Sequence, residues 1–474
     1  MILILTLLQA RGADRVLVDL RLWDGSGAPV VEDAWVAVRG DRILATGQGE
    51  PPPGSRQSLG GRMVIPGLID AHTHPWAVPG AALRGDDEDT RMQARLQGLR
   101  AFVACGVTTV LDAGSSFEAM EALRGWESAG EPSPRLLSLG PVVGPSDGYV
   151  DAFLEGHPGI DSVEDAEQHA ARAKQAGAMG LKLTIEPGYF LPVLPVHSAE
   201  LRREIARVAS QHELPLFVHA QHRQAHLDAI ELQPRAILHI FRDAPGDLPQ
   251  QLAREDIPVV STLHVDHGPL VWQTPQALDD PLSRLVVPAD QRQTATSRTG
   301  WRRYKAAMAR VSLPHSAPLL QSLARRAMPT GDYLRAAARR SLRNLGRVHR
   351  AGGRIVMDSD SGAYDEIPFY FHGLSSLREV ELLVQAGLSP EEALLAATRD
   401  AAQLLGLAGE AGTITAGASA DLVVLDEDPL RDPRALRSVT AVMQRGELRS
   451  PEGWVHGGRR SAPVVLAPIQ GGPP

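Results

Sequence analysis

The sequence predicts an α/β fold in which buried parallel strands alternate with helices. Between residues 64 and 357, short apolar runs recur, and segments with helical periodicity separate them. Strands that alternate with helices in this way are typical of parallel βα units. Both ends of the chain, residues 15–62 and 412–446, instead read as short strands joined by turns. The eight predicted buried strands are 64–69, 107–111, 136–139, 180–183, 216–218, 236–240, 259–263 and 354–357.

Capping residues mark the ends of the predicted helices. Ser389 precedes a proline and is followed three residues later by Glu392, which is the pattern of a capping box. Gly406 stands where that helix should end. In the same way, Asp161 predicts the start of a helix before the fourth strand, and Gly177 predicts its end.

The connection between residues 264 and 353 is longer than an ordinary loop. Its first part, residues 269–298, is polar and contains prolines, which indicates a lid or irregular insertion near a binding site. Its later part has the spacing of a helix with one apolar face. Because the chain is acidic overall, a solvated outer face explains the arginine stripe on this helix better than nucleic-acid binding does. The stripe comprises Arg335, Arg339, Arg343, Arg347 and Arg350.

Composition is that of an ordinary globular chain with a net charge of −8 and a pI near 6.1. This balance gives no reason to expect a nucleic-acid partner. Cys105 is the single cysteine, so an intramolecular disulfide and a cysteine-based zinc site are both excluded. Its apolar neighbours predict a buried thiol.

The N-terminus carries a continuous apolar run over residues 1–8, which is too short to span a bilayer. The run reads either as the remnant of a signal peptide over residues 1–12 or as a first strand. We favour the signal remnant, which predicts a periplasmic or secreted protein, and the alternative is a cytoplasmic one.

A pair of histidines directly follows the first buried strand. His72 and His74 are two residues apart, so in extended chain their imidazoles project to the same side. Two imidazoles at this spacing can reach one cation, and they suit zinc and similar metals. The plain alternative is two hydrogen-bonded histidines in a loop.

The string PGLIDAHTHP at residues 66–75 resembles the signature of the amidohydrolase superfamily, which comprises metal-dependent hydrolases. Further matching pieces occur in the family's order, and the resemblance covers roughly residues 14–445. It is closest to the imidazolonepropionase-like branch, which includes Xaa-Pro dipeptidases. The resemblance implies a (β/α)8 TIM barrel over residues 63–411, with an insertion or lid at about 264–350, and a small composite β-sandwich domain from residues 14–62 and 412–460. The matching pieces are Lys182, His219, His239, Asp360 and the closing strand at 417–426.

The resemblance also implies two divalent metal ions, with zinc as the default and manganese, iron or cobalt as substitutes. His72, His74 and Asp360 would hold one metal, and His219 and His239 the other. Lys182, carbamylated to N6-carboxylysine, would bridge the two ions together with a hydroxide. In this scheme the bridging hydroxide attacks the substrate, and Asp360 moves its proton to the leaving group.

Position along the strands supports these assignments independently of the family. All six candidates fall at or just past predicted strand ends, and catalytic residues of a TIM barrel lie at the C-terminal ends of its strands. Asp358 rivals Asp360, and His222 and His226 rival His219, because they lie nearby in the chain. We prefer Asp360 because it fits the family's register, and His219 because His222 and His226 lie beyond the strand end, on the following helix or loop. His264 and His267 are at most lid residues or neighbours of the site.

The substrate is less well indicated. Tyr149, Tyr189, His222 and Arg223 follow predicted strands and are candidates to line a pocket. An arginine there could pair a substrate carboxylate, although a surface ion pair is the commoner fate of one arginine. The branch favours an amide bond in a small molecule such as a dipeptide or N-acyl amino acid. The alternatives are an esterase, lactonase or phosphotriesterase-type hydrolase on the same centre, or a non-catalytic scaffold. We expect a small-molecule substrate, no nucleic-acid partner and no membrane span, and we leave homo-oligomerisation open.

Overall fold

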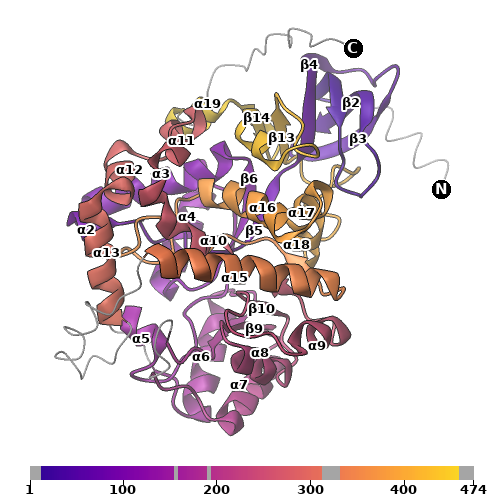
Figure 1. Ribbon diagram of the computed structural model, residues 1–474. Helices are drawn as coiled ribbons and strands as arrows, with labels where there is room; N and C mark the ends of the chain where they lie inside the picture. Colours follow the sequence, from indigo (N-terminus) through magenta and orange to yellow (C-terminus); the bar gives the residue numbers. More distant parts are fainter. Residues whose placement is uncertain (1–11, 154–158, 189–193, 312–330, 458–474) are drawn as a thin grey trace.

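The structure is a computed structural model, described here for residues 12–153, 159–188, 194–311 and 331–457 (Figure 1). Strands from the two ends of the chain, indigo and yellow in Figure 1, lie side by side, and the segments between them form a larger part. The apolar N-terminal run and Tyr189 lie outside the described residues. Within the described ranges, no helix has both the length and the apolar character needed to cross a membrane.

The larger part contains the predicted parallel strands. They form a three-stranded sheet in the order β5-β6-β7 and a five-stranded sheet in the order β12-β11-β10-β9-β8. Every pairing within these two sheets is parallel. The strands are β5 (Leu68–Thr73), β6 (Val107–Asp112), β7 (Arg135–Ser138), β8 (Leu181–Thr184), β9 (Leu216–His219), β10 (Ala236–Leu238), β11 (Val259–Val260) and β12 (Ile355–Val356).

Backbone hydrogen bonds join the two sheets where the segments after β12 and β5 meet. Between β12 and β5, the amide of Asp360 donates to the carbonyl of His72 (2.9 Å), and the amide of His74 donates to that of Ser361 (2.8 Å). Between β7 and β8, Val143 forms a parallel bridge with β8. The arrangement is therefore a TIM-barrel-like α/β fold. The first seam also brings together the two chain segments that carry the predicted histidine pair and aspartate.

Helices follow the parallel strands in alternation, as the sequence predicts. Those after β5 to β10 are α2 (Ala81–Arg84), α3 (Glu88–Ala104), α4 (Phe117–Ser128), α5 (Tyr149–Phe153), α6 (Val163–Gln175), α7 (Ala199–Gln211), α8 (Arg223–Ile230) and α9 (Leu248–Arg254). Those after β11 are α10 (His264–His267), η1 (Gly268–Gln273), η2 (Pro275–Leu278), α11 (Pro281–Val286), α12 (Ala289–Thr296), α13 (Arg298–Val311) and α15 (Gly331–Arg350). Those after β12 are α16 (Leu374–Ala386), α17 (Pro390–Ala396), α18 (Arg399–Leu404), η3 (Pro433–Arg437) and α19 (Pro451–His456).

Alternate residues of the parallel strands face two different cores. Leu68 and Val110 pack in the large core, which also includes helix residues, whereas Ile69 and Leu111 belong to a smaller cluster with Phe217. A strand that is covered on both faces reads as a continuous apolar run, because side chains alternate between the faces. This is why the buried strands could be found in the sequence from apolar runs alone.

The strand-rich ends pair with each other in one seven-stranded sheet of order β15-β14-β13-β4-β1-β2-β3. Its apolar side chains, among them Leu17, Val36 and Val424, form a separate core. The two ends therefore pair in a single mixed sheet. The two-layered sandwich stays a prediction. The strands are β1 (Arg15–Leu22), β2 (Val31–Arg39), β3 (Arg42–Gln48), β4 (Ser55–Pro66), β13 (Leu422–Leu425), β14 (Val439–Gln444) and β15 (Glu447–Arg449).

Gly67 separates two strands where the sequence predicted one continuous strand over 64–69. β4 belongs to the terminal sheet and β5 to the parallel sheets, so the chain passes from one unit to the other at this residue. The Gly67 amide donates to the carbonyl of Asp421 (2.8 Å). A Cβ at this position would lie 2.1 Å from Oγ1 of Thr108, so no larger residue fits without movement.

We therefore expect Gly67→Ala to lower the free energy of unfolding by about 1–3 kcal/mol, since overpacking a close contact has costs of this size. Gly125→Ala is the matched control. It lies within α4, a Cβ there would meet nothing within 4 Å, and the change should stabilise by about 0.5–1 kcal/mol. Urea denaturation of both variants checks this, and equal stability of Gly67→Ala and the parent would contradict it.

Three sequence-based expectations need correction. Residues 269–298 form short helices rather than an irregular insertion. Three of their four prolines stand at the first or second helical position, where no amide is required, and the fourth, Pro288, is the N-cap of α12. The helix predicted to run to Gly406 is split into α17 and α18, although Ser389 does form the capping box. Ser162, rather than Asp161, caps α6. Cys105 is fully buried, as predicted.

Candidate metal centre

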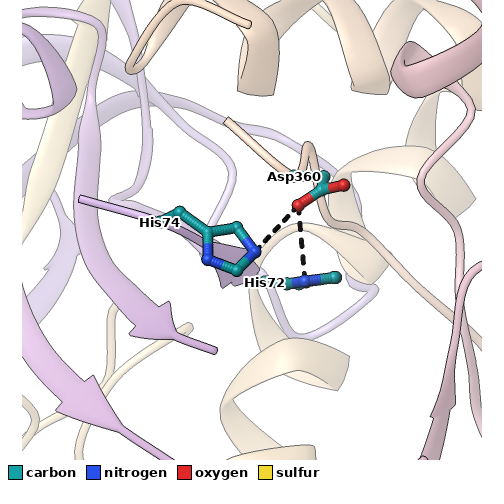
Figure 2. A group of neighbouring side chains, drawn as sticks. All are labelled: His72, His74 and Asp360. Carbon is teal, nitrogen blue, oxygen red and sulfur yellow. Dashed lines mark ion pairs between the residues drawn. The ribbon is translucent and has the colours of Figure 1, made fainter. Parts of the chain in front are cut away.

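Three predicted ligands converge at the seam between β5 and β12 (Figure 2). Oδ1 of Asp360 lies 3.1 Å from Nε2 of His74 and 3.4 Å from Nε2 of His72. The three residues offer ligand atoms that all lie within 4.8 Å of one another. A metal ion that binds nitrogen and oxygen at about 2.0–2.2 Å can contact three donors spaced in this way. The group is therefore a possible metal site.

Asp70 fixes the backbone that carries these ligands. Its buried carboxylate accepts hydrogen bonds from the amide (3.0 Å) and hydroxyl (2.6 Å) of Ser359 and from the hydroxyl of Ser376 (2.6 Å). Burial raises the pKa of Asp70 to about 6 despite these bonds. Asp360 itself has a φ of 50°, an uncommon conformation for a residue other than glycine that is found where surrounding contacts enforce it.

Lys182 lies beside this group, buried on β8. Its Nζ is 2.9 Å from Nε2 of His72. Leu181 and Leu183 belong to the large core, so Lys182 points to the other face of the strand. Burial lowers the pKa of Lys182 to about 8, although Asp360 favours the charged amine. A larger share of this amine is therefore neutral near pH 8 than for an exposed lysine.

His219 and His239 meet next to His72. The ring centroids of His219 and His239 are 4.2 Å apart, and those of His72 and His239 are 5.0 Å apart. His239 directly follows β10 and has a φ of 76°. Burial, followed by the influence of His219, lowers the pKa of His239 well below its usual range. All four histidines and Lys182 are thus brought together from four different strands.

Unpaired buried atoms fit a cation at this place. Both ring nitrogens of His239 and Oδ1 of Asp360 have no hydrogen-bond partner among the described residues. Buried polar groups are ordinarily paired, because an unpaired one loses its hydration without compensation. Imidazole and carboxylate donors suit zinc and related divalent metals. The residues present therefore fit the metal that the sequence predicted.

Asp358 occupies a different position from Asp360. Its Oδ2 lies 3.5 Å from Nδ1 of His72, on the side of the ring away from the contact with Asp360. Burial raises the pKa of Asp358 well above its usual range, and Glu379 adds to this effect. A carboxylate on the far nitrogen of a ligand histidine orients its ring. The two aspartates thus face opposite nitrogens of the His72 ring, and the preference for Asp360 as a ligand stays a prediction.

Glu186 is a buried neighbour of the site that sequence reasoning missed. Its carboxylate lies 3.7 Å from Nε2 of His219 and 3.3 Å from Nε2 of His222. Burial opposes its ionisation, but the neighbouring imidazoles lower the pKa of Glu186 to about 2. Glu186 follows Lys182 by four residues, and alternate residues of an extended strand share one face. This spacing could have indicated that Glu186 lies on the same side of the chain as Lys182.

The predicted substrate residues lie in different settings. Tyr149 is buried, and its ring centroid is 5.1 Å from that of His219. His222 is half-buried between Glu186 and Asp243. Arg223 pairs with the exposed Asp247 (3.0 Å), the surface ion pair that was its alternative reading. A role for any of them in substrate binding stays a prediction.

Other aromatic and histidine side chains near the site are placed as follows. Tyr364, which sequence reasoning missed, stacks on His74 with ring centroids 6.0 Å apart. His226 has each ring nitrogen 3.1 Å from a backbone carbonyl oxygen, so its nitrogens are not available as ligands. His264 and His267 lie on the short helix α10 after β11. The preference for His219 over His226 agrees with this geometry.

The model of the amidohydrolase family matches this chain over residues 63–449. This chain belongs to the amidohydrolase family. The match covers most of the chain and includes all six predicted ligands. It confirms the expectation of a hydrolase that acts on carbon–nitrogen bonds, and metal binding is general in this family.

Among curated relatives, the imidazolonepropionase of Rhizorhabdus wittichii is 26% identical over 432 residues, which cover 87% of this chain and 93% of that enzyme. The imidazolonepropionase of Streptomyces coelicolor is 35% identical over 97 residues, and here the match spans only 23% of that enzyme and 20% of this chain. Both similarities agree with the branch that the sequence motifs indicated.

Among solved structures, a Xaa-Pro dipeptidase with bound methionine superposes with a TM-score of 0.70 at 18% identity, covering 92% of this chain and 99% of that one. A prolidase complexed with N-methylphosphonate-L-proline gives a TM-score of 0.69 at 21% identity, with the same coverage. At these identities the likeness shows the fold, which agrees with the TIM-barrel-like architecture.

Proposed function

We propose that this protein is a binuclear metal-dependent amidohydrolase that cleaves an amide bond in a small substrate such as a dipeptide or N-acyl amino acid. The observation that carries the proposal is the convergence of His72, His74 and Asp360 with the buried Lys182 at 2.9 Å from His72. The proposal includes a closed (β/α)8 barrel with a β-sandwich domain beside it.

His72, His74 and Asp360 would hold one metal, and His219 and His239 the other, with Lys182 between them. Bound divalent metals in such a site polarise a carbonyl group and lower the pKa of water toward about 7. Asp360 would take a proton from the attacking water and deliver it to the leaving nitrogen, because its carboxylate lies at the centre of the group. His72 is oriented for its part by Asp358.

Lys182 would act as a carboxylate after its amine reacts with carbon dioxide. The burial of the amine supports this, because an unmodified ammonium in this position loses its hydration. The lowered pKa of Lys182 leaves neutral amine available, which is the form that can attack carbon dioxide. The carbamate so formed would supply the negative charge that a pair of divalent metals requires.

The preference for an amide bond rests on the similarity to the imidazolonepropionase-like branch. Comparing the hydrolysis of amide and ester substrates tests it. Purified protein should hydrolyse a dipeptide or an N-acyl amino acid with a higher kcat/KM than the matched ester. The imidazolonepropionase and prolidase names of the relatives support a carbon–nitrogen bond as the target. The measurement is kcat/KM on paired amide and ester analogues that share one acyl group.

Fast turnover of the ester with no cleavage of any dipeptide or N-acyl amino acid would contradict the amide preference and support the esterase alternative. That outcome would leave the metal site itself untouched. Protein that binds metal but turns over no amide, ester or phosphotriester would support the scaffold alternative.

A further inference from the structure

Glu186 is placed by the strand that carries Lys182. β8 ends at Thr184, but the amide of Ile185 still donates to the carbonyl of His219 (2.9 Å), so the chain continues alongside the end of β9. The next residue, Glu186, is therefore held next to the imidazole of His219. Glu186 is 1% exposed, and its carboxylate lies between two imidazoles rather than facing solvent.

The two carboxylate oxygens of Glu186 have different surroundings. Oε1 accepts a hydrogen bond from the amide of Gly188 (3.0 Å) and lies 3.3 Å from Nε2 of His222. Oε2 faces Nε2 of His219 at 3.7 Å and has no hydrogen-bond partner among the described residues. A buried carboxylate oxygen without a partner is costly unless a neighbouring group carries a donor or positive charge toward it.

The His219 ring would supply a donor toward Oε2 of Glu186 when it binds a metal. Its Nε2 faces Oε2 of Glu186 at 3.7 Å. The side-chain nitrogen of Gln221, which can only donate, lies 3.3 Å from the same Nε2, and this contact is given up when Nε2 carries the proton. This leaves Nδ1 for a metal, on a ring whose centroid is 4.2 Å from that of His239. A histidine that binds metal through one nitrogen donates the N–H of the other to a carboxylate or carbonyl, which fixes its tautomer and orientation.

We propose that Glu186 is a positioning residue for the second metal: it accepts the Nε2–H of His219 and so directs Nδ1 toward the ion, while its other oxygen holds His222. This inference rests on the proposed binuclear function and deepens it. The arrangement mirrors the one on the first metal, where Asp358 faces Nδ1 of His72 and leaves Nε2 toward Asp360.

The shared carboxylate also joins a buried imidazole to a more exposed one. The side chain of His222 is 30% exposed, whereas that of His219 is 6% exposed. His222 is thus the one of the two imidazoles that solvent or substrate can reach. Loss of Glu186 should therefore loosen the imidazoles of His219 and His222 together.

The test is zinc binding to metal-free protein in bicarbonate buffer, measured by competition with a chromophoric chelator. Glu186→Gln keeps the shape of the side chain but removes the charge, and we expect its affinity for the second zinc to fall by about 10–100-fold. Glu186→Asp should recover part of the loss, because it retains the carboxylate. His222→Ala should leave the zinc affinity unchanged, since His219 keeps its partner.

Glu381→Gln is the matched control for loss of a buried carboxylate, because Glu381 pairs instead with Arg378 and Arg437. It should bind zinc as the parent does. Parent-like affinity for both zinc ions in Glu186→Gln would overturn the positioning role. An equal loss of affinity in Glu186→Gln and Glu381→Gln would overturn it too, because the effect would then be structural. A parent protein that binds a single zinc overturns the binuclear function instead, so the two failures are distinguishable.

Discussion

Replacing Asp360 with asparagine should lower kcat/KM by about 10²–10⁴-fold, the range associated with loss of a positioned acid–base group. The carboxylate lies within 3.4 Å of both histidines of its group, so the change also removes a metal ligand. An asparagine keeps the shape of the side chain, and the fold should therefore be retained. Steady-state kinetics on an amide substrate, with circular dichroism as a check of folding, measures the effect.

Asp358→Asn is the control for this variant. Asp358 faces Nδ1 of His72 and is not one of the three grouped ligands, His72, His74 and Asp360. Its replacement should therefore lower kcat/KM by only about 10–100-fold. The reverse ranking of the two variants would show that the register after β12 has been misread. The comparison is matched because both side chains are buried and only two residues apart.

Lys182→Ala should lose most of the bound metal and reduce turnover to a small remainder. The change removes the one candidate bridge between the two histidine groups and leaves a cavity beside His72. Short carboxylic acids such as formate, acetate or propionate should restore part of the activity, because they can enter that cavity and replace the missing carboxylate. Elemental analysis and kinetics with and without added acid measure both effects.

Lys174→Ala serves as the control, since Lys174 is an exposed lysine paired with Glu213. It should retain metal and activity, because an exposed ion pair contributes little. If Lys182→Ala keeps its metal and its activity, then the lysine has a structural role and the bridging carbamate is wrong.

The parallel strands could be predicted from the sequence. Both faces of each strand are buried, so each strand appears as a continuous apolar run with turn residues on either side. Each predicted parallel strand overlaps an observed one, from β5 to β12. The end of β4 at Pro66 was not predicted, because one apolar run, 64–69, contains the end of β4 and the start of β5. The run divides at Gly67 because β4 pairs with β1 and β13 whereas β5 pairs with β6, and these long-range pairings are not visible in the local pattern.

Several contacts of the site could not be predicted from the chain alone. Asp358 and Glu186 face ligand histidines from other strands, and their positions depend on how neighbouring strand ends pair. The ion pair of Arg223 with Asp247 depends likewise on the packing of α8 beside α9. The convergence of His72, His74 and Asp360 was predictable because strand ends meet at one face of the barrel.

The central claim is that this chain holds two metal ions in one site. The most direct measurement is elemental analysis of active protein prepared with zinc and bicarbonate, together with removal of the metal by a chelator. We expect about two zinc ions per chain, slow loss of activity on chelation and recovery on adding zinc. One ion or none in fully active protein, or activity that survives complete removal of metal, would contradict it.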